Sequence, residues 1–359
     1  MPYEILTKRQ LNRATLARQH LLERHDAGPE HEVEHLVGMQ AQNPLDPYYG
    51  LHSRLNGFDP AVLAAHVADR EMVRGGFMRG TIHLVSTDDF FRVHPVTADV
   101  MRRVFNSTQF AKDCAGLDME ELLARGRALM EAQPMTRAAI AAALADEYPE
   151  RVAASLAQAV TYLSPLIQVP PRGVWGQTGP AAWAYAPTYL GRSYESGQPV
   201  TDLVVRYLGA FGPAAVKDMR VWSGLTGLRE VFESLRSELV TFRDESGAEL
   251  FDLPDAPRPD PETSAPPRFL PEYDNVLLGH ADRSRFFVSG GPTPPGWVGS
   301  VLVDGVYAGH WKQGEEEWVV TLTSSAMPEV DELEAEASRM AEMIWPDANA
   351  TLEIRPLEP

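Results

Sequence analysis

The chain has 359 residues, one cysteine and a formal net charge of −18. This length allows two to four domains with their own cores, and no apolar run approaches the roughly 20 residues that cross a bilayer. Cys114 alone excludes an intrachain disulfide and a thiolate metal cluster, and the start of the chain lacks a signal-peptide pattern, so we expect a cytoplasmic protein with no metal, no cofactor and no membrane association.

The acidic balance counts against a nucleic-acid partner, because phosphate binding depends on Lys and Arg. Much of the acid is confined to residues 243–252, 314–318 and 329–342. The basic residues gather elsewhere, at Arg70, Arg74, Arg79, Arg102, Arg103, Lys217, Arg220, Arg268, Arg283 and Arg285. Because the acidic and basic residues are separated along the chain, a locally positive surface is possible despite the negative total charge.

Residues 1–116 predict a first unit of three helices followed by a β-hairpin. Thr7 is a suitable N-cap for the first helix, and Asp59 is a suitable N-cap for the third, with Pro60 in its first turn. Two β-rich runs, residues 71–78 and 81–86, are joined at Arg79–Gly80. This order of elements is that of a winged helix.

The second helix of this unit begins near Glu32 and leads to the stretch VGMQAQNPLDPYYG, which contains Gln40 and Gln42. Because Pro44 should push Asn43 out of the helical region, the two glutamines are predicted on the last helical turn or just past it. An amide carries one acceptor and two donors, so such a pair could hold a water molecule or clasp a base edge. The alternative is that both side chains merely cap or solvate a helix end.

The same order of elements recurs twice. Residues 117–198 predict helices at 119–132, 136–148 and 152–164, the second with Thr136 as its N-cap, and then a hairpin. Residues 199–254 repeat the pattern with strands at 239–244 and 248–253. Residues 252–267 hold six prolines and read as an exposed linker, and the remainder predicts strands, a hairpin turn at Asp304–Gly305, a helix at 329–345 and a last strand. The predicted fold class is α+β: three tandem winged-helix units with a small C-terminal α+β cap spanning residues 255–359.

The stretches MQAQNPLDPYYGLHSRL, FMRGTIHLVS and LPEYDNVLLGHADRSR resemble the winged-helix family of AlkZ-type crosslink-repair and alkylpurine DNA glycosylases. The resemblance covers nearly the whole chain in the expected order. It implies tandem winged helices around a concave DNA-binding surface, a catalytic Gln-apolar-Gln motif at Gln40–Ala41–Gln42, and a β-hairpin that approaches DNA, for which Asp304–Gly305 is the candidate.

An amide pair limits the chemistry that such a site can perform. Amides do not titrate, so they cannot protonate an ordinary leaving base, but a cationic alkylated purine leaves readily and needs mainly a positioned water. With no Lys near the motif in sequence, a Schiff-base lyase step has no evident nucleophile. We therefore predict a monofunctional DNA glycosylase for cationic alkylated purines; the resemblance extends this range to bulky adducts and interstrand crosslinks, in DNA repair or in self-resistance.

The predicted partner is double-stranded DNA that carries alkylated purines, bound by a monomer. Basic and polar side chains near the motifs are the candidate DNA contacts: Arg70, Arg74, Arg79, Thr81, His83, His280, Arg283 and Arg285. A buried His83 is an equal alternative. For Asp274, His280, Asp282 and Arg283 we favour an internal ion-paired network, and for Tyr48, Tyr49, Trp175 and Trp183 we favour packing.

Two other classes of function compete with the enzyme. One is a DNA-binding regulator that does no chemistry, against which the acidic total and the weakly basic third helices count. The other is a scaffold whose winged helices contact proteins, which suits the charge best. A regulator would bind one DNA sequence without releasing base, and a scaffold would show no salt-dependent affinity for DNA.

Overall fold

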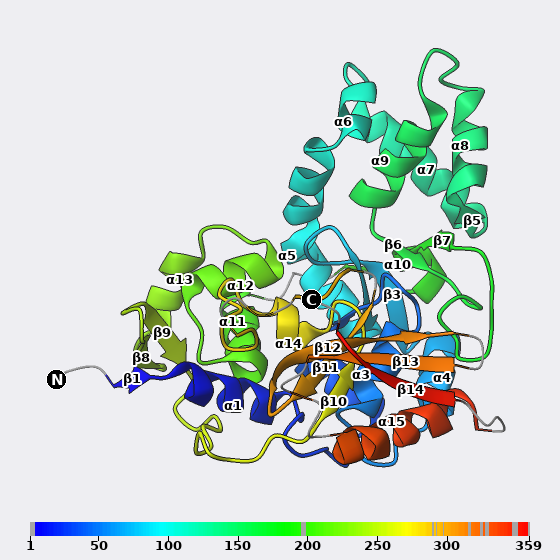
Figure 1. Cartoon of the computed structure of the whole chain (residues 1–359). Helices are drawn as coiled ribbons and strands as arrows, with labels where there is room; N and C mark the ends of the chain where they lie inside the picture. Colours follow the sequence, from blue (N-terminus) through cyan, green and yellow to red (C-terminus); the bar gives the residue numbers. More distant parts are fainter. Residues whose placement is uncertain are drawn as a thin grey trace.

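The computed structural model describes residues 4–194, 199–288, 291, 293–296, 298–314, 317–323, 326, 330–346 and 351–357 (Figure 1). The fold is α+β, as predicted, and its strands form sheets of three, five and six strands. Within the described residues, none of the helices combines the length and apolar character that a membrane span requires.

The first region contains the predicted helices and hairpin, and both predicted N-caps are confirmed: Thr7 accepts a hydrogen bond from Gln10 N and Asp59 accepts one from Ala61 N. The second helix is shorter than predicted, because it ends at His35 and the glutamine motif continues as a strand. The elements are β1 (Ile5–Leu6), α1 (Lys8–Arg18), α2 (Pro29–His35), β2 (Met39–Gln40), α3 (Asp46–His52), α4 (Pro60–Ala68), β3 (Met72–Gly76), β4 (Ile82–Ser86) and α5 (Thr87–Asn106).

The second region stands away from the rest of the molecule at the far end of α5 (Figure 1). Thr136 caps its second helix, as predicted. Its hairpin joins the first one, because β3 pairs with β6 and yields one six-stranded sheet in the order β2-β4-β3-β6-β7-β5. The elements are α6 (Gln109–Asp113), α7 (Met119–Ala132), β5 (Met135–Thr136), α8 (Arg137–Ala145), α9 (Ala153–Leu163), β6 (Leu166–Gln168), β7 (Ala182–Tyr185) and α10 (Ala186–Leu190).

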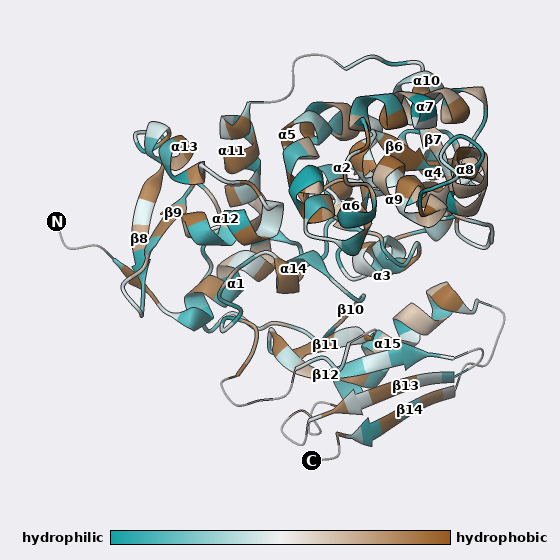
Figure 2. Ribbon diagram, turned by 90° about the horizontal axis from the view of Figure 1, so that it is seen from above, coloured by the Kyte–Doolittle hydropathy of each residue, from teal (hydrophilic) through white to brown (hydrophobic). Residues whose placement is uncertain are grey.

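The third region has the predicted order of helices and strands, and its sheet also takes in the start of the chain, since β1 pairs in parallel with β8. Its helices pack on α1, so that this region lies against the N-terminal end of the molecule (Figures 1 and 2). The elements are α11 (Val200–Phe211), α12 (Val216–Ser223), α13 (Leu228–Ser234), β8 (Val240–Asp244) and β9 (Glu249–Asp252).

The C-terminal region forms a five-stranded sheet in the order β10-β11-β12-β13-β14, on which α15 packs through Leu333, Ala337 and Met340 (Figure 2). The predicted turn at Asp304–Gly305 joins β11 to β12. The elements are β10 (Arg268–Leu270), α14 (Asn275–Leu278), β11 (Gly299–Val303), β12 (Val306–Gln313), β13 (Glu317–Leu322), α15 (Val330–Ile344) and β14 (Thr351–Pro356).

The proline-rich stretch is exposed at many of its residues, as predicted, but it is also held against α1. Arg9, Arg13 and Arg18 project from α1 and donate hydrogen bonds to the carbonyls of Pro261, Thr263 and Pro257. Composition indicated exposure because Pro lacks a backbone donor, but the carbonyls of the stretch remain available as acceptors. The stretch is therefore a strap laid along α1.

The hydrophobic cores do not follow the predicted segments. One cluster combines Phe77 and Phe90 of the first region with Tyr207, Phe211 and Trp222 of the third. The second region has its own cluster. Helix α5, about 30 Å long at 1.5 Å per residue, contributes Phe90 to the first cluster and Phe105 to the second. The first and third regions thus form one packed body to which α5 attaches the second region.

Candidate active site

The strand that replaces the predicted helix brings both glutamines against the hairpin of β3 and β4. Val37 and Gly38 have φ values of 55° and 94°, which a helix cannot continue, and β2 then pairs Gln40 with His83 of β4. Met39 and Ala41 are buried at 3% and 0% exposure, and the backbone N–H of Ala41 donates to the carbonyl of Ile82, so the chain stays beside β4 for one residue past β2. Gln40 is 8% exposed and Gln42 is exposed.

The orientation of each amide is fixed by a group that can only donate. The guanidinium of Arg79 donates from Nη2 to Gln40 Oε1 at 3.1 Å, and the backbone N–H of Ile82 donates to Gln42 Oε1 at a longer 3.4 Å. Because a donor must meet the oxygen and not the NH₂ group, these contacts distinguish the two ends of each amide. Each Oε1 keeps a second lone pair for a water molecule.

Arg74 holds the backbone between the two glutamines. Its Nη2 donates to the carbonyl of Ala41 at 2.8 Å, and its Nη1 donates to Gln168 Oε1 of β6 at 2.9 Å. Burial lowers the pKa of Arg74 to about 10, and the side chain is 2% exposed. The expectation that Arg74 contacts DNA does not hold for a side chain so placed, since it is buried and both of its Nη groups bind the motif and the neighbouring hairpin.

Arg79 is the cation of the site. It lies in the hairpin turn with a φ of 55°, followed by Gly80 at 74°, as in a type I′ turn, where a residue with a Cβ is disfavoured. Besides Gln40, it donates to the carbonyl of Trp222 at 2.5 Å and to His83 Nε2 at 3.2 Å. Burial and the nearby charge of Arg283 lower the pKa of Arg79 to about 10. It remains cationic at neutral pH, and its hydrogen-bond partners among the described residues are all neutral.

His83 is the buried histidine of the alternative prediction. It is 0% exposed, and burial and the Arg79 charge hold its pKa well below the usual value. Since Arg79 only donates, Nε2 accepts, and Nδ1–H is then the donor to the carbonyl of Thr81 at 3.3 Å. Thr81 itself is half-buried and donates to the carbonyl of Met78. His83 therefore supports Arg79 and is shielded from solvent.

Of the other candidate DNA contacts, two are exposed to solvent and two are buried. Arg283 is exposed beside Arg79, whereas Arg70 is exposed at the far end of β3, over the ring of Tyr189. Arg285 is 6% exposed and donates to Thr15 Oγ1 at 3.0 Å, and His280 is 2% exposed with Nε2 at 2.8 Å from the carbonyl of Phe211. The last two side chains are interior, so the expectation that they contact DNA does not hold for this conformation.

The turn at Asp304–Gly305 is packed against α1 and does not project freely as a DNA-approaching hairpin would. The Asp304 carboxylate pairs with Arg13, and with Arg9 at 2.7 Å, while Asn12 donates to the carbonyl of Gly305 at 2.7 Å. A Cβ on Gly305 would lie 2.6 Å from Asn12 and from Leu16. The sequence could not indicate this contact, because almost 300 residues separate the partners.

The predicted packing residues are confirmed. Tyr48 and Tyr49 are 1% and 5% exposed and contact Trp175, and Trp183 is 4% exposed. Of the four residues for which an internal ion-paired network was favoured, Asp274 is ion-paired inside the protein, with both Nη atoms of Arg54 at 2.7 and 2.8 Å. Asp282 and Arg283 are exposed.

Three polar residues near the motif were missed by sequence reasoning. Asp46, Glu272 and Lys312 line a cavity of about 440 Å³ together with Asn43, which follows Gln42. Burial, and next the charge of Glu272, raise the pKa of Asp46 to about 8, and its Oδ2 has no hydrogen-bond partner within the described part of the chain. Position in the sequence gave a signal only for Asp46, four residues beyond Gln42.

Lys312 bears on the predicted absence of a lyase step. That prediction rested on the lack of a lysine close to the motif in sequence, but β12 brings Lys312 to the cavity that Asn43 lines. The side chain is exposed and so lacks the desolvation that activates lysine nucleophiles. Within the described residues, no group of three or more His, Cys, Asp or Glu is arranged to hold a metal ion.

The chain is similar to known DNA glycosylases. A family model described as "DNA glycosylase AlkZ-like" matches residues 33–343. An interstrand DNA cross-link repair glycosylase of Streptomyces sahachiroi is 25% identical over 329 residues, which cover 85% of this chain and 88% of that protein. The solved structure of the S. sahachiroi DNA glycosylase AlkZ matches with a TM-score of 0.76 at 21% identity, over 98% of this chain and 100% of that one, which shows a common fold.

Proposed function

Because this chain belongs to the AlkZ-like family of DNA glycosylases, we propose that it releases cationic alkylated purines from double-stranded DNA with Gln40 and Gln42 as its catalytic residues. The observation that carries the proposal is that both amide oxygens accept hydrogen bonds from one hairpin, Gln40 Oε1 from Arg79 in its turn and Gln42 Oε1 from the N–H of Ile82 at the start of β4. A regulator or a scaffold would have no need of this arrangement.

The amides act by positioning a water molecule. The water donates to the free lone pairs of Gln40 Oε1 and Gln42 Oε1, which turns its own lone pair toward C1′ of the sugar. The bond between C1′ and N9 of the purine breaks, and its electron pair neutralises the cationic base. The water oxygen then bonds to C1′ and releases a proton to solvent, so the products are the free base and an abasic site. Fixed dipoles of this kind contribute several kcal/mol when water is largely excluded.

Arg79 supplies a positive charge beside the reacting sugar. A buried cation is normally paired with an anion, and the hydrogen-bond partners of Arg79 in the described chain are neutral. A DNA phosphate next to the lesion is the natural counter-ion, with Arg283 as its second contact. Arg70 and Thr81 are further candidates for backbone contacts, on the exposed and half-buried parts of the same hairpin region.

The range of substrates that we propose is based on the similar glycosylase of Streptomyces sahachiroi. That protein is named for interstrand crosslink repair, and we extend bulky adducts and crosslinks to this chain as substrates, in repair or self-resistance. We further propose that the chain works as a cytoplasmic monomer, and that residues 1–116, 117–198 and 199–254 are three tandem winged-helix units with 255–359 as the cap. The three repeats of helices followed by two strands support this division.

Release of free base tests the function. The purified protein, incubated with double-stranded DNA that contains 7-methylguanine, should liberate 7-methylguanine and leave abasic sites, which chromatography of the soluble fraction detects. Binding of one DNA sequence without base release would indicate a regulator instead.

The Gln42→Ala variant tests the site. We expect base release to fall by roughly a hundredfold or more, as when one preorganised polar group is removed from an active site, with little change in melting temperature because Gln42 is exposed. Gln177→Ala, at another exposed glutamine, is the matched control and should retain activity. If Gln42→Ala releases base as fast as the parent, the amide mechanism is wrong.

A further inference from the structure

A second and larger cavity adjoins the site. It has a volume of about 730 Å³ and lies between α14, the segment after it and the start of β11. It shares Glu272 and Val298 with the cavity that Asn43 lines. At its other side it is lined by Arg283, whose charge acts on Arg79, the partner of Gln40. The cavity is therefore close to two residues that neighbour the glutamine pair: Asn43, which lines the adjoining cavity and follows Gln42 in the chain, and Arg79, which feels the charge of Arg283.

One wall of the cavity is apolar. Leu277, Leu278, Phe287 and Val298 line it. The volume falls within the range of small-molecule sites, about 300 to 1,000 Å³, whereas a methyl group on a purine would occupy only a small part of it. The cavity is thus larger than a small lesion requires.

Two exposed apolar residues line the same cavity. Val288 is 64% exposed and Tyr273 is 36% exposed, and both belong to its lining. Single exposed apolar residues are ordinary on protein surfaces, but two that share one cavity are characteristic of a contact site. Tyr273 also has a φ of 61°, a conformation that residues with a Cβ rarely adopt and that concentrates at functional sites.

Charged groups at different places in the cavity lining favour one orientation of a bound adduct. Glu272 interacts with Tyr273 through a side-chain hydrogen bond and lies on the wall shared with the cavity that Asn43 lines. A carboxylate there favours a cationic base. Lys8 and Arg283 lie along the lining as well, where cations suit DNA phosphates.

We propose that this cavity receives the aromatic or apolar substituent of a bulky cationic purine adduct while the sugar of that purine lies at Gln40 and Gln42. Tyr273 and Val288 contact the substituent as it enters, and the wall formed by Leu278 and Phe287 surrounds it. This inference rests on the proposed glycosylase function and assigns a substrate class to a subsite of it.

The test compares a large and a small lesion at the same cationic bond. Duplexes carry 7-methylguanine or 7-(naphthylmethyl)guanine, and the measured quantity is the ratio of kcat/KM for the naphthyl lesion to that for the methyl lesion. In the parent this ratio should exceed one. Leu278→Trp fills the cavity and should lower the ratio about tenfold, which corresponds to about 1.4 kcal/mol. Val205→Trp, at an exposed position of α11, is the control and should keep the parental ratio.

A second variant and a binding measurement guard against a folding defect. Phe287→Ala removes apolar wall without adding bulk and should also lower the ratio. Duplexes with 2′-fluoro sugars, which resist base release, report binding alone: the parent should bind the naphthyl duplex more tightly than the methyl duplex, and Leu278→Trp should bind both alike.

The outcomes separate the two proposals. Naphthyl preference in binding without any base release would refute the glycosylase chemistry and retain the cavity. Base release with the same ratio in the parent, Leu278→Trp and Phe287→Ala would refute the cavity and retain the chemistry. A parent that binds both 2′-fluoro duplexes equally would also overturn the cavity proposal.

Discussion

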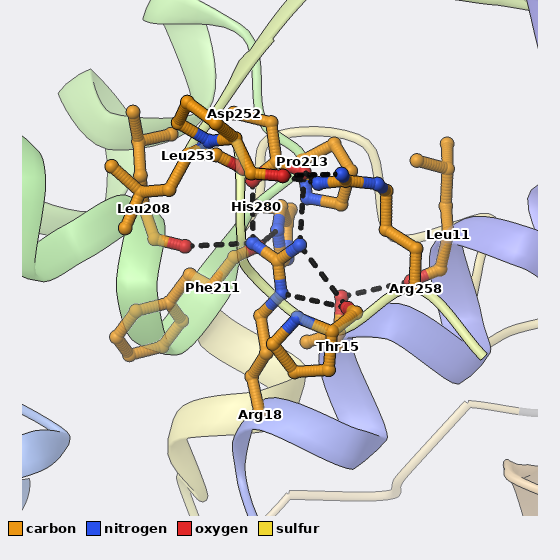
Figure 3. A network of polar contacts seen from close by, with 12 residues as sticks. Leu11, Thr15, Arg18, Leu208, Phe211, Pro213, Asp252, Leu253, Arg258 and His280 are labelled. Atoms are coloured by element: carbon orange, nitrogen blue, oxygen red, sulfur yellow. Dashed lines mark hydrogen bonds and ion pairs between the residues drawn. The ribbon is translucent and has the colours of Figure 1, made fainter. Parts of the chain in front are cut away.

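The buried charges of this protein behave differently in two places. In the network around Arg18 each charge meets its opposite: the Asp252 carboxylate accepts from Arg18 at 2.6 and 2.9 Å and from Arg258 at 2.6 Å (Figure 3). Around the glutamine pair, Arg79 has neutral partners in the described chain, and Asp46 is held uncharged at neutral pH. We call a network saturated when its buried charge has a partner of opposite charge, and such a network stabilises the fold. In an unsaturated network the charge has no such partner, so the network can bind a charged ligand. This contrast distinguishes Arg18, which is part of the scaffold, from Arg79, which is part of the site.

The largest expected effect comes from breaking the saturated network. Asp252→Asn removes the charge that neutralises Arg18, both side chains being 0% exposed, and loss of one partner of a buried pair typically costs about 3–5 kcal/mol. We expect a matching loss in the free energy of unfolding, measured by urea denaturation. Asp255→Asn, exposed on the same strap, should leave stability unchanged. Equal stability of both variants would show that the Arg18 network is not saturated as described.

Asp46 provides a pH-dependent test on the unsaturated side. Its pKa rises from 3.8 to about 8 on folding, so between these values the folded protein keeps a proton that the unfolded chain has lost. The contribution of protonated Asp46 to the free energy of unfolding is fully present below the unfolded pKa of 3.8. As pH rises further, the free energy of unfolding falls by about 1.4 kcal/mol per pH unit, until the pH passes the folded pKa of about 8.

The corresponding variant is Asp46→Asn, which is neutral at every pH. Its stability relative to the parent should increase as pH rises from 5 to 8 and level off above that range, as followed by denaturation at each pH. A constant difference across this range would mean that Asp46 is ionised in the folded protein.

A smaller effect on stability is expected at Arg79. Arg79→Met removes hydrogen bonds to neutral groups and no ion pair, so unfolding should become easier by only about 1–2 kcal/mol. If a phosphate is the missing counter-ion, the dependence of DNA affinity on salt should weaken by about one phosphate contact. Arg103→Met is the control, because Arg103 donates to Gly224 at the end of α12, where Arg79 also binds. If Arg79→Met destabilised the protein as much as Asp252→Asn does, Arg79 would not differ from Arg18 in the way described.

No effect is expected from Lys312, which lines the cavity together with Asn43. Lys312 is exposed, so treatment with borohydride during the reaction should trap no covalent protein–DNA complex. Trapping in the parent and its loss in Lys312→Ala would instead identify a lyase step and revise the monofunctional prediction.

Local signals in the sequence predicted the elements whose geometry is local. Thr7, Asp59 and Thr136 cap helices as expected, because the capping acceptor and the backbone donor lie within three residues of each other. The glutamine motif was placed on a helix because its apolar spacing fits one. Two left-handed residues and pairing with a strand over 40 residues away decide otherwise, and no local pattern contains that pairing.

The same limit applies to the site. Resemblance identified Gln40 and Gln42, but nothing in the sequence indicated that Asp46 and Lys312 line one cavity or that Arg74 holds the carbonyl of Ala41. Among the predicted DNA contacts, residue type alone could not separate the exposed Arg283 from the buried Arg285, since only packing against Thr15 makes the difference.

The pairing of β3 with β6 has a practical consequence for dissecting this protein. A fragment that stops at residue 116 would bare the flank of β3 that Ile167 and Gln168 cover, and would take from Arg74 one of the acceptors that steady it. Bare flanks of this kind invite aggregation. Measurements on truncated fragments would therefore reflect the loss of this strand pairing. The role of each region has to be determined with substitutions in the full-length protein.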